Sequence, residues 1–316
     1  MKNKAFSMIE LSIVVLIIGI LVAGVTQSSR LVKQIKIATA RSITKSSPVS
    51  GIKDLALWLE PTMDESFIEI QADDDYKVTQ WNDVNPQNTI KYYAVKAGTT
   101  AVTFTSNGIN NIPSLKFTGA TGTGGYFVLS TSNTISQASK VKTFGNRFTF
   151  FTVAKADNEV VGKFRATFYN SPDPSADGWG NIKTADNKRG ILFNDNMLCS
   201  TNTSNSTGAA EITTAVYEGV VTGNMTVYVN GATETTSVAT QSGGSSGFVS
   251  GTSTDASYSP LTTNPAFYVG SIGGPGNETW KGLISEIIIF DRVLRNEERK
   301  SVEKYLSKKY GIKITE

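Results

Sequence analysis

One carboxylate draws attention because it lies inside an otherwise uncharged apolar run. Residues 6–25 read FSMIELSIVVLIIGILVAGV, and Glu10 is the only charged side chain among them. A carboxylate at the centre of a helix in lipid costs about 2.5–3.5 kcal/mol, so such a group usually has a partner. A cut after Ala5 would give Phe6 a free α-amino cation four residues before Glu10. Glu10 of one subunit could then pair with the Phe6 ammonium of a neighbouring subunit.

The rest of the composition excludes several kinds of catalytic site. The 316 residues include no histidine and one cysteine, Cys199. Without histidine there is no Ser-His-Asp or Cys-His triad, no histidine-bound zinc and no imidazole pH switch. A single cysteine forms no internal disulfide and no CxxC site. The 30 basic and 27 acidic residues nearly cancel and leave a net charge of +3. A net charge this small does not indicate nucleic-acid binding.

The apolar run has the length of a membrane-spanning helix. About 20 apolar residues cross about 30 Å of hydrocarbon. Apolar residues continue at helical spacing to about Ser42, and Pro48 disfavours helix at Ser47. We therefore expect one membrane-anchored helix over residues 6–47.

At this point the N-terminus resembles the prepilin family of type IV pilins and pseudopilins. The resemblance is carried by Lys2-Asn3-Lys4-Ala5, then Phe6-Ser7-Met8-Ile9-Glu10-Leu11, then the apolar helix. It implies a leader of residues 1–5, cleavage between Ala5 and Phe6 by a prepilin peptidase, and N-methylation of Phe6. It also implies that Glu10 registers subunits in a filament through the Phe6 amine. Ala5 stands where glycine is usual.

The same resemblance implies a location and partners. The precursor would lie in the bacterial inner membrane with its head in the periplasm, and would then enter a pilus or pseudopilus, as in type II secretion, with exposure at the cell surface. The implied partners are the prepilin peptidase, other pilin-like subunits and the assembly platform. No nucleic-acid partner is expected.

Three other interpretations of the N-terminus remain open. An ordinary secretory signal would be cleaved near Val22-Ala23-Gly24, although Glu10 inside the apolar region argues against it. A plain signal anchor would not be cleaved. Under the positive-inside rule, the basic residues that follow the span would favour the opposite topology; they are Arg30, Lys33, Lys36, Arg41 and Lys45.

Residues 48–316 have the pattern of one β-rich head. Short apolar or alternating runs recur about every 10 residues between Gly, Asn, Asp and Pro, which is typical of a sandwich or jelly roll. The expected strands are 56–59, 101–104, 114–117, 126–129, 148–154, 166–169, 190–193, 211–221, 224–229, 266–269 and 282–290. Residues 200–208 and 232–264 are rich in Ser, Thr and Gly, which predicts long exposed loops.

Two local signals lie in the last third of the chain. Asn230-Gly231 after a strand predicts a hairpin with a type I′ turn. Asn296 as N-cap and Gly311 as terminator predict an amphipathic helix of about 13 residues packed on the sandwich. Lys308 and Lys309 suit the negative end of that helix.

Several blocks, taken in order, resemble the concanavalin A-like, laminin-G-like jelly roll of bacterial surface proteins. The blocks lie at residues 57–60, 80–83, 112–119, 148–154, 228–231, 268–270 and 280–294. The resemblance implies two antiparallel sheets with glycan or protein binding on a concave face or a rim loop. The expected fold is mainly β: an N-terminal transmembrane pilin-type helix, a concanavalin A-like sandwich and a C-terminal helix.

The head carries no catalytic signature. Some jelly-roll relatives hydrolyse glycans with a Glu-x-Asp-x-Glu run, which points three carboxylates into one cleft. No such run occurs in the chain, so we assign no catalytic residues and expect no enzyme. Glu286 lies in an apolar strand and is expected to make a structural hydrogen bond or ion pair near the C-terminal helix.

The best candidate ligand loop is residues 171–181, SPDPSADGWGN, with Asp173, Asp177, Trp179 and Asn181. An exposed ring would stack on a sugar while polar groups bind its hydroxyls. The alternative is a turn whose tryptophan packs on the core. No cofactor is expected, although Ca²⁺ stays open at this loop and at Asp73-Asp74-Asp75; solvated turns are the alternative.

These observations predict a type IV pilin-like or pseudopilin-like filament subunit, minor or adhesive, that is membrane-anchored before assembly. Its head would bind a glycan or a surface protein. The alternative is a membrane-anchored or secreted lectin-like glycan-binding protein without a filament role.

Overall fold

The structure is a computed structural model of the chain, and it describes most of the sequence. The described residues are 8–72, 74–119, 122–131, 147–157, 164–170, 179–184, 188–193, 197–201, 208–218, 225–241, 248–250, 266–273 and 279–315.

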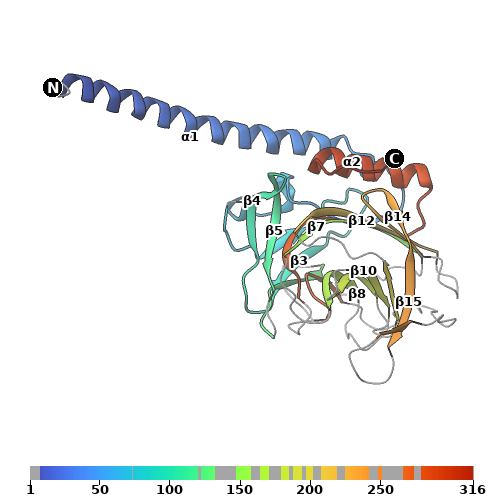
Figure 1. Cartoon of the computed structure of the whole chain (residues 1–316). Coiled ribbons are helices and arrows are strands. Elements are labelled where there is room, and N and C mark those ends of the chain that lie inside the picture. Colours follow the sequence, from blue (N-terminus) through green and yellow to red (C-terminus); the bar gives the residue numbers. More distant parts are fainter. Residues whose placement is uncertain are drawn as a thin grey trace, which may run out of the picture.

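A single long helix, α1 (Met8–Lys45), extends away from a two-sheet head (Figure 1). After α1, the backbone N–H of Ser46 still donates to the carbonyl of Ser42. Pro48 then precedes a short 3₁₀ turn, η1 (Val49–Gly51). Two further 3₁₀ turns, η2 (Asp64–Ser66) and η3 (Glu69–Ala72), follow the first strand. The helix therefore ends close to the proline that the sequence marks as its stop.

The first sheet has eight antiparallel strands in the order β14-β13-β12-β7-β18-β5-β4, with β1 also paired to β18. The long strand β18 (Lys281–Phe290) pairs along one edge with β5 through its first half and with β1 through its second half. The other members are β1 (Leu55–Leu59), β4 (Thr103–Ile109), β5 (Ile112–Thr118), β7 (Phe148–Ala156), β12 (Ala210–Tyr217), β13 (Met225–Val229) and β14 (Ala232–Glu234).

The second sheet has ten strands in the order β16-β15-β11-β10-β9-β8-β17-β6-β3-β2. All its pairs are antiparallel. Its members are β2 (Gln80–Asn82), β3 (Tyr93–Ala97), β6 (Tyr126–Ser130), β8 (Phe164–Asn170), β9 (Trp179–Thr184), β10 (Arg189–Phe193), β11 (Met197–Thr201), β15 (Thr236–Gln241), β16 (Phe248–Ser250) and β17 (Phe267–Val269).

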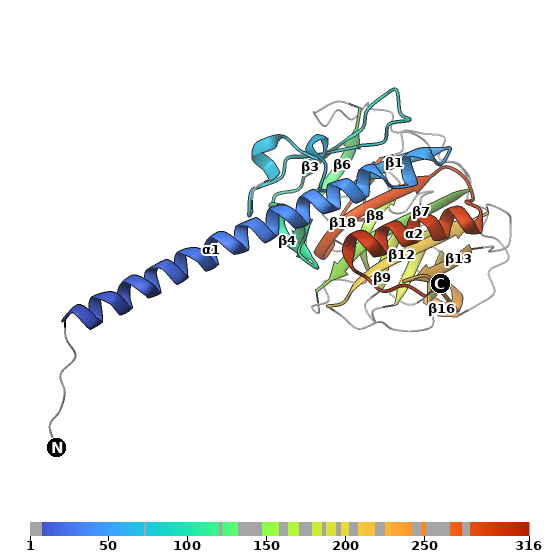
Figure 2. The same cartoon turned by 90° about the horizontal axis from the view of Figure 1, so that it is seen from above.

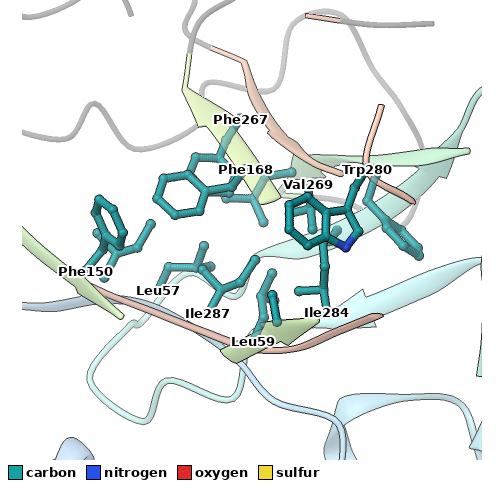
Figure 3. Packing of buried hydrophobic residues seen from close by; sticks show 14 of the residues in the cluster. Leu57, Leu59, Phe150, Phe168, Phe267, Val269, Trp280, Ile284 and Ile287 are labelled. Atoms are coloured by element: carbon teal, nitrogen blue, oxygen red, sulfur yellow. The ribbon is translucent and has the colours of Figure 1, made fainter. Parts of the chain in front are cut away.

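The main core lies between the sheets (Figure 3). Leu57, Phe150 and Ile287 from the eight-stranded sheet meet Phe168 and Phe267 from the ten-stranded sheet, and all five are fully buried. Phe168 and Phe267 are stacked with ring centroids 5.3 Å apart. Burial of these large apolar side chains is the main favourable term that holds the two sheets together.

The eight-stranded sheet also buries its outer face, because helices cover it. α2 (Asn296–Tyr310) and the end of α1 lie side by side over this face (Figure 2). A second cluster joins Ala40 of α1, Phe151 of β7, Ile288 of β18 and Leu306 of α2. The sheet is therefore apolar on both faces, which explains why β1 and β7 read as continuous buried runs.

The predicted fold class is confirmed: mainly β, with an N-terminal apolar helix, two antiparallel sheets and a C-terminal helix. The hairpin at Asn230-Gly231 is confirmed too, with φ of 49° and 79° and Val229 paired to Ala232. Gly311 ends α2 at φ 62°, as predicted.

Two local predictions are wrong. The N-cap of α2 is Arg295 and not Asn296, because the backbone N–H of Arg295 donates to the Glu298 carboxylate and Asn296 lies inside the helix. Residues 232–264 are not one exposed loop: β14, β15 and β16 lie in their described part, and β11 reaches into 200–208. These strands are rich in Ser and Thr and therefore lack the apolar alternation by which strands are predicted. They form by pairing with distant segments, such as β15 with β11.

Candidate functional site: the anchor segment and its junction with the head

The first part of α1, here called the anchor segment (Met8–Val25), is wholly exposed. These 18 residues are long and apolar enough to cross a membrane, and none of them is buried. At 1.5 Å per residue they extend about 27 Å. Glu10 lies in the first turn of the helix and is exposed. Ala5 and Phe6 lie outside the described residues, so the cleavage site and the Phe6–Glu10 pairing stay predictions.

Further along, α1 lies against the head through two ion pairs. The Nζ atom of Lys33 lies 2.5 Å from Oδ2 of Asp74, and a guanidinium nitrogen of Arg41 lies 2.7 Å from Oδ1 of Asp64. Arg41 also donates to the carbonyl oxygen of Thr62. Exposed pairs of this kind contribute about 1 kcal/mol or less each. Two pairs of this strength favour the observed position of α1 on the head but are too weak to hold it there by themselves.

A cluster of buried polar side chains at the end of α1 joins the helix to the head, and it is here called the junction cluster. Its members come from α1, β1 and the turn after it, β18 and α2, and they are Thr44, Trp58, Glu60, Glu286, Tyr305, Lys309 and Tyr310. The ammonium of Lys309 contacts both carboxylates: Nζ lies 2.9 Å from Oε2 of Glu286 and donates to Oε2 of Glu60. A β-bulge in β18 between Ile284 and Glu286 accompanies this placement of Glu286.

Both carboxylates of the cluster have several hydrogen-bond donors. Oε1 of Glu286 accepts bonds from Trp58 Nε1 and the Tyr305 hydroxyl, each at 2.8 Å, and Oε2 accepts one from the Tyr310 hydroxyl at 2.9 Å. This confirms the structural role predicted for Glu286.

Glu60 is held by the turn that follows it and by α1. Its Oε1 accepts bonds from the backbone N–H groups of Thr62 and Met63. Thr44, in the last turn of α1, donates to Glu60 Oε2 at 3.4 Å. Buried charges are tolerated where they are paired and hydrogen-bonded in this way. The last turn of α1 is thereby joined to the strands and to α2.

Burial and the nearby charges act in opposite directions on the groups of this cluster. Burial disfavours the Glu60 carboxylate, but the charge and hydrogen bond of Lys309 outweigh it and hold the pKa of Glu60 below its ordinary value. Burial likewise disfavours the Lys309 ammonium, yet Glu286 and Glu60 raise its pKa. Burial and the same carboxylates raise the pKa values of Tyr305 and Tyr310. These shifts keep Glu60 as a carboxylate, Lys309 as an ammonium, and Tyr305 and Tyr310 as neutral phenols at neutral pH.

The sequence missed most of this cluster. The sequence indicated Lys309 as a favourable charge for the helix dipole and, as an alternative to Tyr310, as part of the packed face of the C-terminal helix; it assigned no role to Glu60 or Thr44. One signal was present: Lys309 follows Tyr305 by four residues and Leu306 by three, so it shares the apolar face of α2. A lysine on that face needs a buried acidic partner.

The structure separates the members of the predicted ligand loop. Trp179 is fully buried in β9, where its ring stacks on Phe148 with centroids 3.7 Å apart. Asn181 points between the sheets and donates to the hydroxyls of Thr152 and Thr167. Asp173 and Asp177 lie outside the described residues. Trp179 therefore presents no exposed ring to a sugar and belongs to the core, which is the alternative that the sequence left open.

No metal centre is assembled in the described part of the chain: it holds no group of three His, Cys, Asp or Glu side chains that could bind an ion. Of the acidic residues considered for Ca²⁺, Asp74 pairs with Lys33 and accepts bonds from Ser106, while Asp73 lies outside the described residues.

Comparison with known proteins gives one family match. Residues 1–26 match the prokaryotic N-terminal methylation motif. The chain thus carries the type IV prepilin motif that residues 2–11 indicated, in a segment that is a small part of its length. No curated protein matches the chain.

Solved structures similar to the chain include three β-rich proteins. Trypanosoma rangeli sialidase is 18% identical over 81% of this chain and 33% of its own, with a TM-score of 0.47. Domain 4 of AbnA, an extracellular arabinanase from Geobacillus stearothermophilus solved with arabinotriose, is 15% identical over 79% and 97%, with a TM-score of 0.46. The binding domain of botulinum neurotoxin DC, solved with rat synaptotagmin II, is 12% identical over 80% and 52%, with a TM-score of 0.47. The chain spans about a third of the length of the sialidase.

Proposed function

We propose that this chain is a type IV pilin-like subunit that is anchored in the bacterial inner membrane before it enters a filament. The observation that carries the proposal is the methylation motif of residues 1–26, placed at the start of an exposed apolar helix. An apolar segment of this length is stable in lipid, and the same surface can pack against equivalent helices in a filament.

The geometry of α1 suits such a transfer. Extraction of a subunit from the membrane requires the anchor and the head to move together. α1 is one continuous helix from Met8 to Lys45, and Thr44 in its last turn belongs to the buried junction cluster. A displacement of the anchor segment would therefore be transmitted to the head without a flexible linker.

We infer a minor or adhesive position in the filament. The head contains two sheets and is larger than a simple structural subunit needs, and its resemblance to laminin-G-like domains favours a glycan or a surface protein as its ligand. We assign the head a binding role and no catalysis. Precursor processing by a prepilin peptidase, a periplasmic head and assembly on a platform follow from the same proposal, in a pilus or in a pseudopilus of type II secretion.

The position of the mature N-terminus tests the proposal. The full chain is produced together with a prepilin peptidase, purified from membranes and analysed by intact-mass and N-terminal peptide spectrometry. We expect a chain that begins at N-methylated Phe6. A variant with Ala5→Leu is the matched control, because a bulky residue before the cut should leave the leader in place. A native chain that begins near Ala23 or Gly24, or that keeps residues 1–5, would overturn the proposal.

A further inference from the structure

A polar cleft, here called the α2 cleft, lies on the outer face of the eight-stranded sheet beside α2 (Figure 2). Its floor is the end of that sheet formed by β12, β13 and β14. Cross-strand pairing places Val216 opposite Thr226 and Tyr228 opposite Thr233, so these side chains share one face. The first turns of α2 form a wall. The volume of about 660 Å³ is that of a small-molecule site, for which about 300–1,000 Å³ is usual.

A smaller cavity of about 250 Å³ continues the α2 cleft along the helix. Lys300 and Thr315 line both cavities. The backbone N–H of Thr315 donates to the carbonyl oxygen of Asn230 at 2.8 Å, which holds the segment 312–315 against the β13–β14 hairpin. Gly231 allows this close approach, because a Cβ atom there would lie 2.4 Å from the Thr315 carbonyl oxygen. The two cavities therefore meet at a segment that the fold holds in place.

Two buried charged side chains of α2 line these cavities. Arg299 lines the α2 cleft and exposes 4% of its surface, and Glu303 lines the smaller cavity and exposes 1%. Nη1 of Arg299 donates to Oε2 of Glu303 at 2.5 Å, and Nη2 donates to Oδ1 of Asn296 at 2.6 Å. The guanidinium carbon also lies 3.7 Å from the centre of the Tyr228 ring. A guanidinium held in this way is pre-organised, so a ligand would bind it with little loss of side-chain freedom.

Glu303 has one acceptor that the fold leaves unused. Its Oε2 pairs with Arg299, but its Oε1 is buried and has no hydrogen-bond partner in the described part of the chain. A buried charged acceptor without a donor is unfavourable, and a donor on a ligand in the smaller cavity would satisfy it. A cationic donor is disfavoured, because Lys300 and Lys304 line the same cavity and would repel it. A neutral hydroxyl group fits best.

The lining of the α2 cleft also favours a ligand that is covered with hydroxyl groups. Besides Arg299, its polar lining includes Glu218, Thr226, Tyr228, Thr233, Asn296 and Lys300. The floor strand β13 is paired on both sides, by β12 and by β14, so an extended peptide cannot add to it. A hydroxyl group both donates and accepts hydrogen bonds, and it therefore matches a lining that offers donors and acceptors together.

We propose that the α2 cleft and the smaller cavity together bind a saccharide. One sugar hydroxyl would donate to Oε1 of Glu303, while Arg299 and Tyr228 would bind sugar oxygens in the cleft. The inference rests on the binding role proposed for the head, and it places the ligand on the outer face of the eight-stranded sheet and not at the buried Trp179. The mature N-terminus tests the filament role and saccharide binding tests this site, so either can fail alone.

The test is a glycan array probed with the fluorescently labelled full chain in detergent micelles at pH 7. Each bound oligosaccharide is then titrated into the chain by isothermal titration calorimetry. The array carries neutral and acidic oligosaccharides, which distinguish a ligand recognised by its hydroxyl groups alone from one that also needs a carboxylate or sulfate. We expect saturable binding of at least one oligosaccharide. The proposal is overturned if the native chain binds none of them.

Three variants locate the site. Arg299→Lys keeps a positive charge beside Glu303 but loses the planar donor group, so the affinity should fall at least tenfold. Tyr228→Phe removes a hydroxyl from the cleft and should lower the affinity at least threefold, and it locates the site if Arg299→Lys does not fold. Tyr76→Phe, at a half-exposed tyrosine outside the cleft, is the matched control and should bind like the native chain. If every cleft variant that folds binds within twofold of the native chain, the saccharide binds elsewhere on the head and the proposal is overturned.

Discussion

The Nζ atom of Lys309 in α2 lies 2.9 Å from Oε2 of Glu286 in β18, and neither side chain exposes more than 1% of its surface. The same ammonium contacts Glu60, which in turn accepts a bond from Thr44 in the last turn of α1. One cation thus compensates two buried carboxylates and connects three parts of the fold. Through Glu60, this contact helps to hold the last turn of α1 on the head.

The first prediction concerns that cation. Lys309→Met should lower the free energy of unfolding by about 3–5 kcal/mol, because it leaves two buried carboxylates without their positive partner. Urea unfolding of the full chain in detergent, followed by circular dichroism, measures the change. The adjacent Lys308 is exposed, so Lys308→Met should change stability by about 0.5 kcal/mol or less. Equal stability of the two variants would contradict the role given to Lys309.

A second prediction concerns pH and Asp83. This carboxylate is buried after β2 and accepts bonds from the backbone N–H groups of Trp58 and Asn85 and from Asn88. Burial outweighs those bonds and raises its pKa from 3.8 to about 6. Between pH 4 and 6 the folded state therefore holds this proton more tightly than the unfolded state. The contribution of Asp83 to the free energy of unfolding should increase as the pH falls through this window, by up to about 3 kcal/mol.

The measurement is the difference in unfolding free energy between the native chain and Asp83→Asn at pH 4, 5, 6 and 7. The native chain should gain stability relative to the variant as the pH decreases from 6 to 4. The control is Asp75→Asn, at an exposed side chain, measured over the same pH range. A constant difference for Asp83→Asn would show that its carboxylate does not titrate in this range.

The third prediction separates a core role from a ligand role for Trp179. Its ring stacks on Phe148 between the sheets, so Trp179→Ala should create a cavity and cost about 3–5 kcal/mol. Thermal unfolding of the full chain detects this loss. Tyr76→Ala, at a side chain that is 39% exposed, should cost about 1 kcal/mol or less. Native-like stability of Trp179→Ala would contradict burial of the ring and would support a ligand-stacking role.

The fourth prediction follows from the proposed filament role. Glu10→Ala removes the carboxylate that would pair with the Phe6 ammonium of a neighbouring subunit, so incorporation into filaments should fall at least tenfold while the leader is still cleaved and the head still folds. Immunoblots of sheared filaments against membrane fractions measure incorporation. Ser12→Ala is the control, since the Ser12 hydroxyl donates to the carbonyl of Ile9 in the same helix. Native-like incorporation of Glu10→Ala would favour a membrane-anchored, lectin-like binder.

Short-range features were predictable because their causes lie within a few residues. The length of an apolar run sets the membrane helix, and a proline sets its end. Asn230-Gly231 and Gly311 were predictable because each needs a positive φ that few other residues adopt. Most strand positions in the head followed from alternation of apolar residues.

The junction cluster was not predictable, because its members meet only through tertiary pairing. Lys309 and Glu60 are 249 residues apart, and the charge of either gives no sign of the other. Trp179 follows a Ser-, Pro- and Asp-rich stretch whose composition is typical of a loop, yet pairing of β9 with β8 and β10 places its ring in the core. The sequence by itself determined the anchor helix, its processing motif and the β-rich class, because these depend on local hydrophobicity and turn chemistry. Only the tertiary structure decided which charges are buried and which of them have partners, because strand register and helix docking bring distant side chains together and remove them from water.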